Sequence, residues 1–194
     1  MLRYSAEARW FFDGNVPEEA VRWFHRSQPP KPPAERSDTY VRQRGCASVG
    51  IKFREQKFEV KSLCAGPEPI EIAAGAAGFT DRWVKWSVTS AALPELERDI
   101  RAGAEILEVG KRRWMRGVSA AHARSAGCDA ELCEITLGKA TAWTFAFEAY
   151  GRPDAVADHL AAAMQEFLSG APAPFALSVA HSLSYPAWLD RQSA

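Results

Sequence analysis

Charged side chains recur at every second position within apolar stretches of this 194-residue chain. A two-residue period places them on one face of a β-strand and the bulky apolar residues on the other face. Guanidinium and ammonium groups, which dominate the charged face, bind phosphate oxygens. A minority of carboxylates beside them suits Mg²⁺ or Mn²⁺, because such ions are held by one or two carboxylates together with substrate phosphates. The charged positions are Glu7, Arg9, Lys52, Arg54, Glu59, Lys61, Lys85, Lys111, Arg113, Glu131 and Glu148.

The strands that carry these residues are separated by turn signals. Residues 65–78 are rich in Gly and Ala and are predicted to form a loop. A polar break at residues 55–57 suits a hairpin, and a two-residue loop there places Lys52 opposite Glu59. Strands are predicted at residues 5–12, 39–42, on both sides of the break within 49–63, and at 83–89, 106–115, 130–137 and 141–150.

Three helices are predicted, at residues 17–27, 93–102 and 153–169, from their apolar spacing and from a Pro near the first turn of the first and last. The apolar tail at residues 175–189 is ambiguous in type. A proline cluster at residues 29–33 resembles a linker, but the residues before it are too few for an independent core. We therefore expect one domain over residues 1–194, with a barrel or sheet core at about 4–151 and a C-terminal helix and tail at 152–194.

The bulk composition excludes several classes of partner. Lys plus Arg and Asp plus Glu both number 24, so no global field attracts duplex nucleic acid or an anionic membrane. The sequence has neither a secretory signal nor a long apolar run, and a cytoplasmic location is the expectation. The Cys and His spacing predicts neither a zinc site nor disulfides. No signal for the oligomeric state is present.

Two architectures produce this alternation. An antiparallel sheet with helices on one face exposes its charges to water. Alternatively, the sheet closes into a barrel with its apolar faces outside, beneath the helices, and the charges surround a tunnel that binds an anion. The abundance of Lys and Arg, where Thr, Gln and Ser would serve a solvated face equally well, favours the tunnel.

The order of short charged motifs resembles that of the CYTH, or triphosphate tunnel metalloenzyme, superfamily. The resemblance spans residues 5–151 and comprises Ser5-x-Glu7-x-Arg9, Asp38-Thr39-Tyr40, Lys52-x-Arg54, Glu59-Val60-Lys61, Lys111-x-Arg113 and Phe147-Glu148. It implies an eight-stranded antiparallel barrel enclosing a tunnel, in an α+β protein with helices packed outside. Members of the family include thiamine triphosphatases, inorganic polyphosphatases, RNA triphosphatases and one class of adenylate cyclase.

The resemblance also implies roles for individual residues. Glu131 is preferred over Glu134, which lies on the opposite face of the same predicted strand. A phosphohydrolase of this type acts on a triphosphate-bearing small molecule or polyphosphate with Mg²⁺ or Mn²⁺. By position, Arg42, Lys52, Arg54, Lys61, Lys85, Lys111 and Arg113 contact phosphate, Glu7, Glu131 and Glu148 are the metal ligands, and Glu7, Arg9 and Glu148 form the catalytic set.

The chain departs from the family pattern in its first strand. Ser5 stands where the family has its first Glu, and Arg9 replaces a Lys. These changes remove one carboxylate and alter the shape of one cation. A second hypothesis is therefore a non-catalytic module of the same fold that holds a phosphorylated or other anionic ligand. A third is an interaction protein with an open sheet and no pocket.

Overall fold

The computed structural model describes residues 2–54, 56–72, 75–118 and 126–192. Within these residues, eight antiparallel strands are β1 (Leu2–Asp13), β2 (Ala34–Val41), β3 (Val49–Arg54), β4 (Lys57–Ile72), β5 (Ala76–Val88), β6 (Ile106–Gly117), β7 (Gly127–Leu137) and β8 (Ala140–Gly151).

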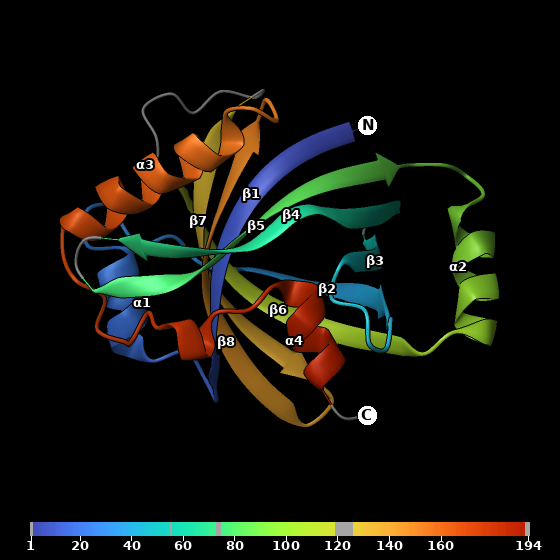
Figure 1. Cartoon of the computed structure of the whole chain (residues 1–194). Coiled ribbons are helices and arrows are strands. Elements are labelled where there is room, and N and C mark those ends of the chain that lie inside the picture. The colour runs from blue at the N-terminus through green and yellow to red at the C-terminus, as the bar shows by residue number, and fades with distance from the viewer. Residues whose placement is uncertain (1, 55, 73–74, 119–125, 193–194) are drawn as a thin grey trace.

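The strands close into a barrel (Figure 1). Hydrogen-bonded neighbours follow the order β1-β5-β4-β3-β2-β6-β7-β8, and β8 returns to pair with β1. The closed barrel confirms the predicted fold class, an α+β protein with an antiparallel barrel and helices packed outside it. It also excludes the open sheet, and the interaction-protein hypothesis that required an open sheet without a pocket is wrong.

The main hydrophobic core lies outside the barrel wall, beneath helices α1 (Glu18–Phe24) and α3 (Val156–Ser169). Alternation turns Trp10, Phe145 and Phe147 outward toward these helices, and all three are fully buried. The opposite faces of the same strands point into the barrel. Burial of the aromatic side chains therefore fixes which residues face the interior, since a shift of one residue would exchange the two faces.

A second apolar cluster closes one end of the barrel interior. Helix α4 (Tyr185–Arg191) follows a single 3₁₀ turn (Val179–His181). Its N-cap is Ser184, whose hydroxyl accepts a hydrogen bond from the Ala187 backbone at 3.3 Å. The Trp188 ring of α4 stacks on Phe11 with centroids 5.0 Å apart. The ambiguous C-terminal tail thus folds partly as a helix that packs against inward-facing residues of the strands.

Helix α2 (Leu93–Gly103) connects β5 to β6 at the end of the barrel opposite α1 and α3 (Figure 1). Of its side chains only Leu93 is buried. No helix in the part of the chain that the structure describes combines the length and the apolar character needed to cross a membrane.

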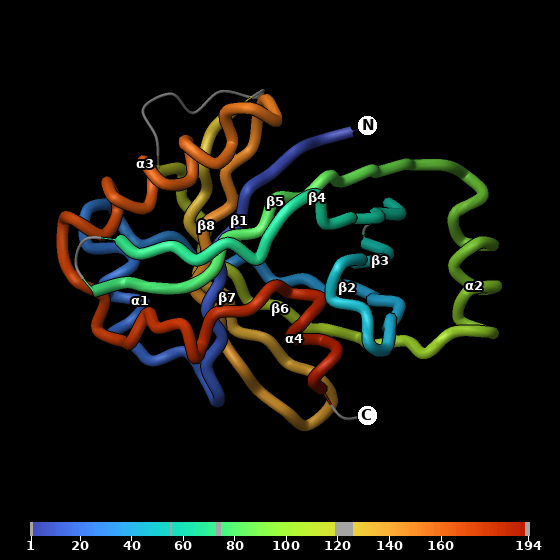
Figure 2. Tube along the Cα trace, in the orientation of Figure 1, coloured from blue at the N-terminus to red at the C-terminus, as the bar shows by residue number. Residues whose placement is uncertain are grey.

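The predicted loop at residues 65–78 is wrong. β4 continues to Ile72 and β5 begins at Ala76, so that a long two-stranded ribbon extends toward α1 and α3 (Figure 2). Ile70 and Ile72 pack against the main core. Pairing with β5 and this distant packing override the low strand propensity of Gly and Ala. Residues 55, 73 and 74, which fall in the predicted polar break and loop, lie outside the described residues.

Candidate anion-binding site

One cavity inside the barrel collects the charged residues of the strands. Its lining includes all eleven residues to which the sequence assigned phosphate contact, metal binding or catalysis. Nine basic side chains and five carboxylates line it, so the surplus charge is positive. The basic residues are Arg9, Arg36, Arg42, Lys52, Arg54, Lys61, Lys85, Lys111 and Arg113, and the acidic residues are Glu7, Glu59, Glu131, Glu148 and Asp190.

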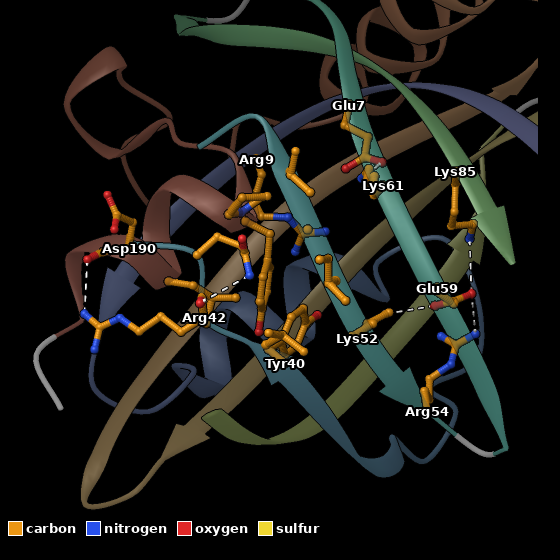
Figure 3. A pocket seen from close by; sticks show the side chains of 18 of the residues that line it. Glu7, Arg9, Tyr40, Arg42, Lys52, Arg54, Glu59, Lys61, Lys85 and Asp190 are labelled. Carbon is orange, nitrogen blue, oxygen red and sulfur yellow. Dashed lines mark hydrogen bonds and ion pairs between the residues drawn. The ribbon is translucent and has the colours of Figure 1, made fainter. Parts of the chain in front are cut away.

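Glu59 lies at the centre of one group of cations (Figure 3). Its carboxylate is 3.3 Å from Lys52 Nζ, 3.6 Å from Arg54 Nη2 and 3.8 Å from Lys85 Nζ. Burial alone would raise the pKa of Glu59, but the three cations outweigh it and lower the pKa to about 2. Lys52 and Glu59 are directly opposite in the β3–β4 ladder, as the two-residue hairpin loop predicted.

Glu131 joins two arginines in a second group. Arg9 Nη1 donates to Glu131 Oε1 at 2.8 Å, and Arg113 Nε donates to Oε2 at 2.6 Å. Burial opposes ionisation of this carboxylate, but Arg113 and Arg9 hold its pKa well below the usual range. Glu134 lies on the outer face, where it accepts a hydrogen bond from the Val16 backbone. The preference for Glu131 over Glu134 as the inward residue is confirmed.

Asp38 is the third centre and is completely buried. One of its oxygens, Oδ2, lies 2.8 Å from Lys111 Nζ and 3.4 Å from Lys52 Nζ, and Arg36 Nε is 3.3 Å from Oδ1. Burial would raise the pKa of Asp38, yet Lys111 and Lys52 lower it far below the ordinary value. Tyr40 Oη donates to Asp38 Oδ2 at 3.4 Å.

Asp38 and Tyr40 belong to one of the motifs named above but had no expected role in the site, and Arg36 was not among the expected site residues. The sequence held a signal for all three, because they occupy every second position of one strand. Arg36, Asp38 and Tyr40 alternate as the other inward residues do. The predicted strand began at residue 39, however, and the strand actually begins at Ala34.

Acidic side chains form a row across four neighbouring strands. Glu7 on β1 pairs with Asp81 on β5 and with Glu148 on β8, and Glu148 pairs with Asp129 on β7. Lys61 forms an ion pair with Glu7, and Ser5 Oγ donates to Glu7 at 3.1 Å. Among the described residues, no three Asp, Glu, His or Cys side chains are placed to hold one metal ion.

Asp81 is expected to make stability depend on pH. Burial first, and then the neighbouring Glu7, raise its pKa from 3.8 to about 6. A carboxyl with a raised folded-state pKa stabilises the fold below pH 4, and this contribution is lost as the pH rises through 6. Relative to wild type, Asp81→Asn should therefore gain up to about 3 kcal/mol of unfolding free energy between pH 4 and pH 8.

Urea denaturation at both pH values in EDTA checks this expectation. Asp154→Asn is the matched control, since Asp154 is largely exposed in a surface pair with Arg152 and should show no comparable gain. Equal pH profiles for Asp81→Asn and wild type would contradict the raised pKa.

Arg42 lies at the mouth of the cavity, and its guanidinium is hydrogen-bonded to the C-terminal segment. Its guanidinium donates to Glu105 Oε1 at 2.7 Å, to the Asp190 carbonyl at 3.3 Å and to the Gln192 carbonyl. Figure 3 shows Arg42 beside Asp190. Asp190 in turn accepts from the Gly45 backbone at 2.8 Å. These bonds fasten α4 across the mouth and leave only part of the Arg42 guanidinium for a ligand.

No protein-family model matches the sequence, and no curated protein matches it. Among solved structures, the chain is similar to a conserved hypothetical protein from Pyrococcus furiosus. The two share 12% sequence identity with a TM-score of 0.45, over 83% of this chain and 90% of that chain. A similarity at this level supports no inference about what the barrel binds.

Proposed function

We propose that the barrel is a tunnel for a triphosphate-bearing small molecule or polyphosphate, which it hydrolyses with Mg²⁺ or Mn²⁺ in the manner of the CYTH superfamily. The observation that carries this proposal is the convergence of nine basic side chains on one cavity within a closed barrel. Lysine and arginine inside a cavity bind phosphate oxygens more strongly than at a surface, because water screens them less.

The cations around Glu59 retain capacity for a ligand. Their distances to its carboxylate, 3.3 to 3.8 Å, exceed the roughly 2.7 to 2.9 Å of a strong charge-assisted hydrogen bond. Lys52, Arg54 and Lys85 together carry more N–H donors than one carboxylate accepts. A phosphate group beside Glu59 would engage the unused donors.

The carboxylates fit a divalent ion that is held by two side chains together with substrate phosphates. Glu7 and Glu148 are cross-strand partners, and both line the cavity. Glu131 fits less well, because Arg9 and Arg113 occupy both of its oxygens. When bound, the ion would neutralise phosphate charge and help to position the attacking water.

The side chains of the tunnel would contribute positioning and electrostatic stabilisation to this reaction. The basic group around Glu59 orients the phosphates, and Lys61 beside Glu7 offsets charge that develops on the oxygens during in-line attack by water. Arg9, fixed by Glu131 and by Thr144 Oγ1 at 2.9 Å, presents its guanidinium from β1. No side-chain nucleophile is required.

A second candidate is a module that holds the same class of ligand without hydrolysing it. Two observations favour it: Ser5 supplies a hydroxyl where the family has a carboxylate, and Glu131 is engaged by arginines on both oxygens. This candidate shares the binding site of the first and differs only in the absence of turnover.

Orthophosphate release distinguishes the two candidates. The protein is incubated with tripolyphosphate, ATP or thiamine triphosphate in Mg²⁺, Mn²⁺ or EDTA. The hydrolase predicts release that requires the metal. Release that persists in EDTA would contradict the metal-dependent mechanism, whereas binding without release would establish the module.

A further inference from the structure

Lys111 has the most enclosed ammonium group of the tunnel. Four of the seven lysines of the chain line the cavity. The side chain of Lys111 is 6% exposed, against 17% for Lys52, 23% for Lys61 and 25% for Lys85. Its Nζ lies 4.1 Å from the centroid of the Tyr185 ring and 2.8 Å from both Tyr40 Oη and Asp38 Oδ2.

The charges around this amine do not favour its protonation. Lys111, Lys52 and Arg36 share the single carboxylate of Asp38. Arg113 faces the same interior from β6, Arg9 and Glu131 face it from β1 and β7, and the Cys133 thiol and Tyr185 complete the surroundings. Burial, and then Lys52, lower the pKa of Lys111 to about 7, although Asp38 opposes this shift.

We infer that Lys111 is a nucleophilic amine that captures a phosphorylated aldehyde as an imine within the tunnel. This inference rests on the proposed phosphate binding, and it assigns Lys111 a covalent role that phosphate hydrolysis does not need. A desolvated lysine beside another cation has the environment in which amines attack carbonyl groups.

The geometry supplies partners for each stage of the reaction. The Nζ lone pair attacks the carbonyl carbon, a C–N bond replaces the C–O π bond, and one proton moves from Nζ to the carbonyl oxygen to give a carbinolamine. The hydroxyl then leaves as water with one proton taken from the solvent, and a protonated C=N bond remains. The resulting protonated imine remains beside the Asp38 carboxylate, which stabilises its positive charge.

The phosphate requirement follows from the neighbours of Lys111. Lys52 Nζ and Lys111 Nζ contact the same Asp38 oxygen, at 3.4 and 2.8 Å. Lys52 also belongs to the cation group around Glu59. A phosphate bound there therefore holds a carbonyl on the same small molecule near the Lys111 amine, which raises its effective concentration.

Pyridoxal 5′-phosphate is a suitable probe, because its imine absorbs visible light. The protein is incubated with the probe, reduced with borohydride, digested and mapped by mass spectrometry. The expected result is one label per chain, on Lys111. The rate of labelling should reach half its maximum near pH 7. An ordinary lysine, with a pKa of about 10.4, would reach that midpoint only at a much higher pH. Label confined to Lys52, Lys61 or Lys85 would overturn the inference.

Three comparisons sharpen the test. Lys111→Arg should lose the imine, whereas Lys139→Arg, at an exposed position between β7 and β8, should retain it. Pyridoxal without phosphate should require about a tenfold or higher concentration, and tripolyphosphate should compete with the phosphorylated probe. Stabilisation of the same preparation by tripolyphosphate, without any imine on the native protein, would reject the role of Lys111 while leaving the proposed function intact. If tripolyphosphate does not stabilise the protein and no imine forms, the tunnel is rejected as a phosphate site.

Discussion

Glu148→Gln should lower metal-dependent phosphate release by about 100-fold or more, because loss of a metal ligand exceeds the 10- to 100-fold effect of losing a supporting contact. Glu148 lines the cavity opposite Glu7. Burial raises its pKa, but Lys61 and Lys85 outweigh burial and keep it ionised. The neutral amide retains the shape and removes the charge.

Glu134→Gln provides a matched control on the neighbouring strand. Glu134 lies on the outer face, 4.0 Å from Arg112, and should leave phosphate release unchanged. Circular dichroism and melting curves would verify that both variants fold. Full activity of Glu148→Gln with the metal present would contradict the assignment of Glu148 as a ligand.

Asp38→Ala should destabilise the fold by about 3 to 5 kcal/mol, the usual cost of removing one partner from a buried ion pair. Its carboxylate is fully buried and contacts Lys111, Lys52 and Arg36. Without it Lys111 and Arg36 lose this partner, whereas Lys52 keeps Glu59. Because the pKa of Asp38 is depressed, its contribution is present at neutral pH and is lost as the pH falls well below 4.

Urea denaturation at pH 7 measures this loss. The double variant Asp38→Ala with Arg36→Met should recover part of it, since the guanidinium, which keeps its charge without a partner, is then absent. Asp99→Ala, in an exposed pair with Arg98, should change stability by less than about 0.5 kcal/mol. Equal effects of Asp38→Ala and Asp99→Ala would show that the buried network contributes no stability.

Alternation was sufficient to predict which side chains face the interior. Glu7, Arg9, Lys52 and Arg54 all line the cavity because a strand packed on one face has only one register in which its large apolar residues are buried. The pairing of Lys52 with Glu59 followed from loop length alone, since a two-residue turn fixes the ladder.

Other features depend on contacts distant in sequence. The β4–β5 ribbon forms from Gly- and Ala-rich segments because each strand pairs with the other and packs beneath distant helices. The seating of α4 at the barrel mouth depends on Phe11, Tyr40 and Arg42, which belong to two other elements and a loop. No local pattern in the tail encodes that surface.

Asp38 illustrates a further limit. A lone Asp near a predicted strand end has the sequence signature of a turn residue. Only the strand order brings β3 and β6 to either side of β2, so that Lys52 and Lys111 reach one carboxylate. Charge networks of this kind arise from the order of strands in the sheet rather than from spacing along the chain.

The most direct test of the phosphate tunnel is the melting temperature with and without tripolyphosphate, measured in Mg²⁺, Mn²⁺ and EDTA. A ligand that binds only the native state adds about 2.7 kcal/mol of stability at 100 times its dissociation constant. The proposed function predicts a rise with tripolyphosphate that is larger with the metal than in EDTA. If tripolyphosphate raises the melting temperature in none of the three conditions, the tunnel is not a phosphate site, and its cations are paired only with their own carboxylates.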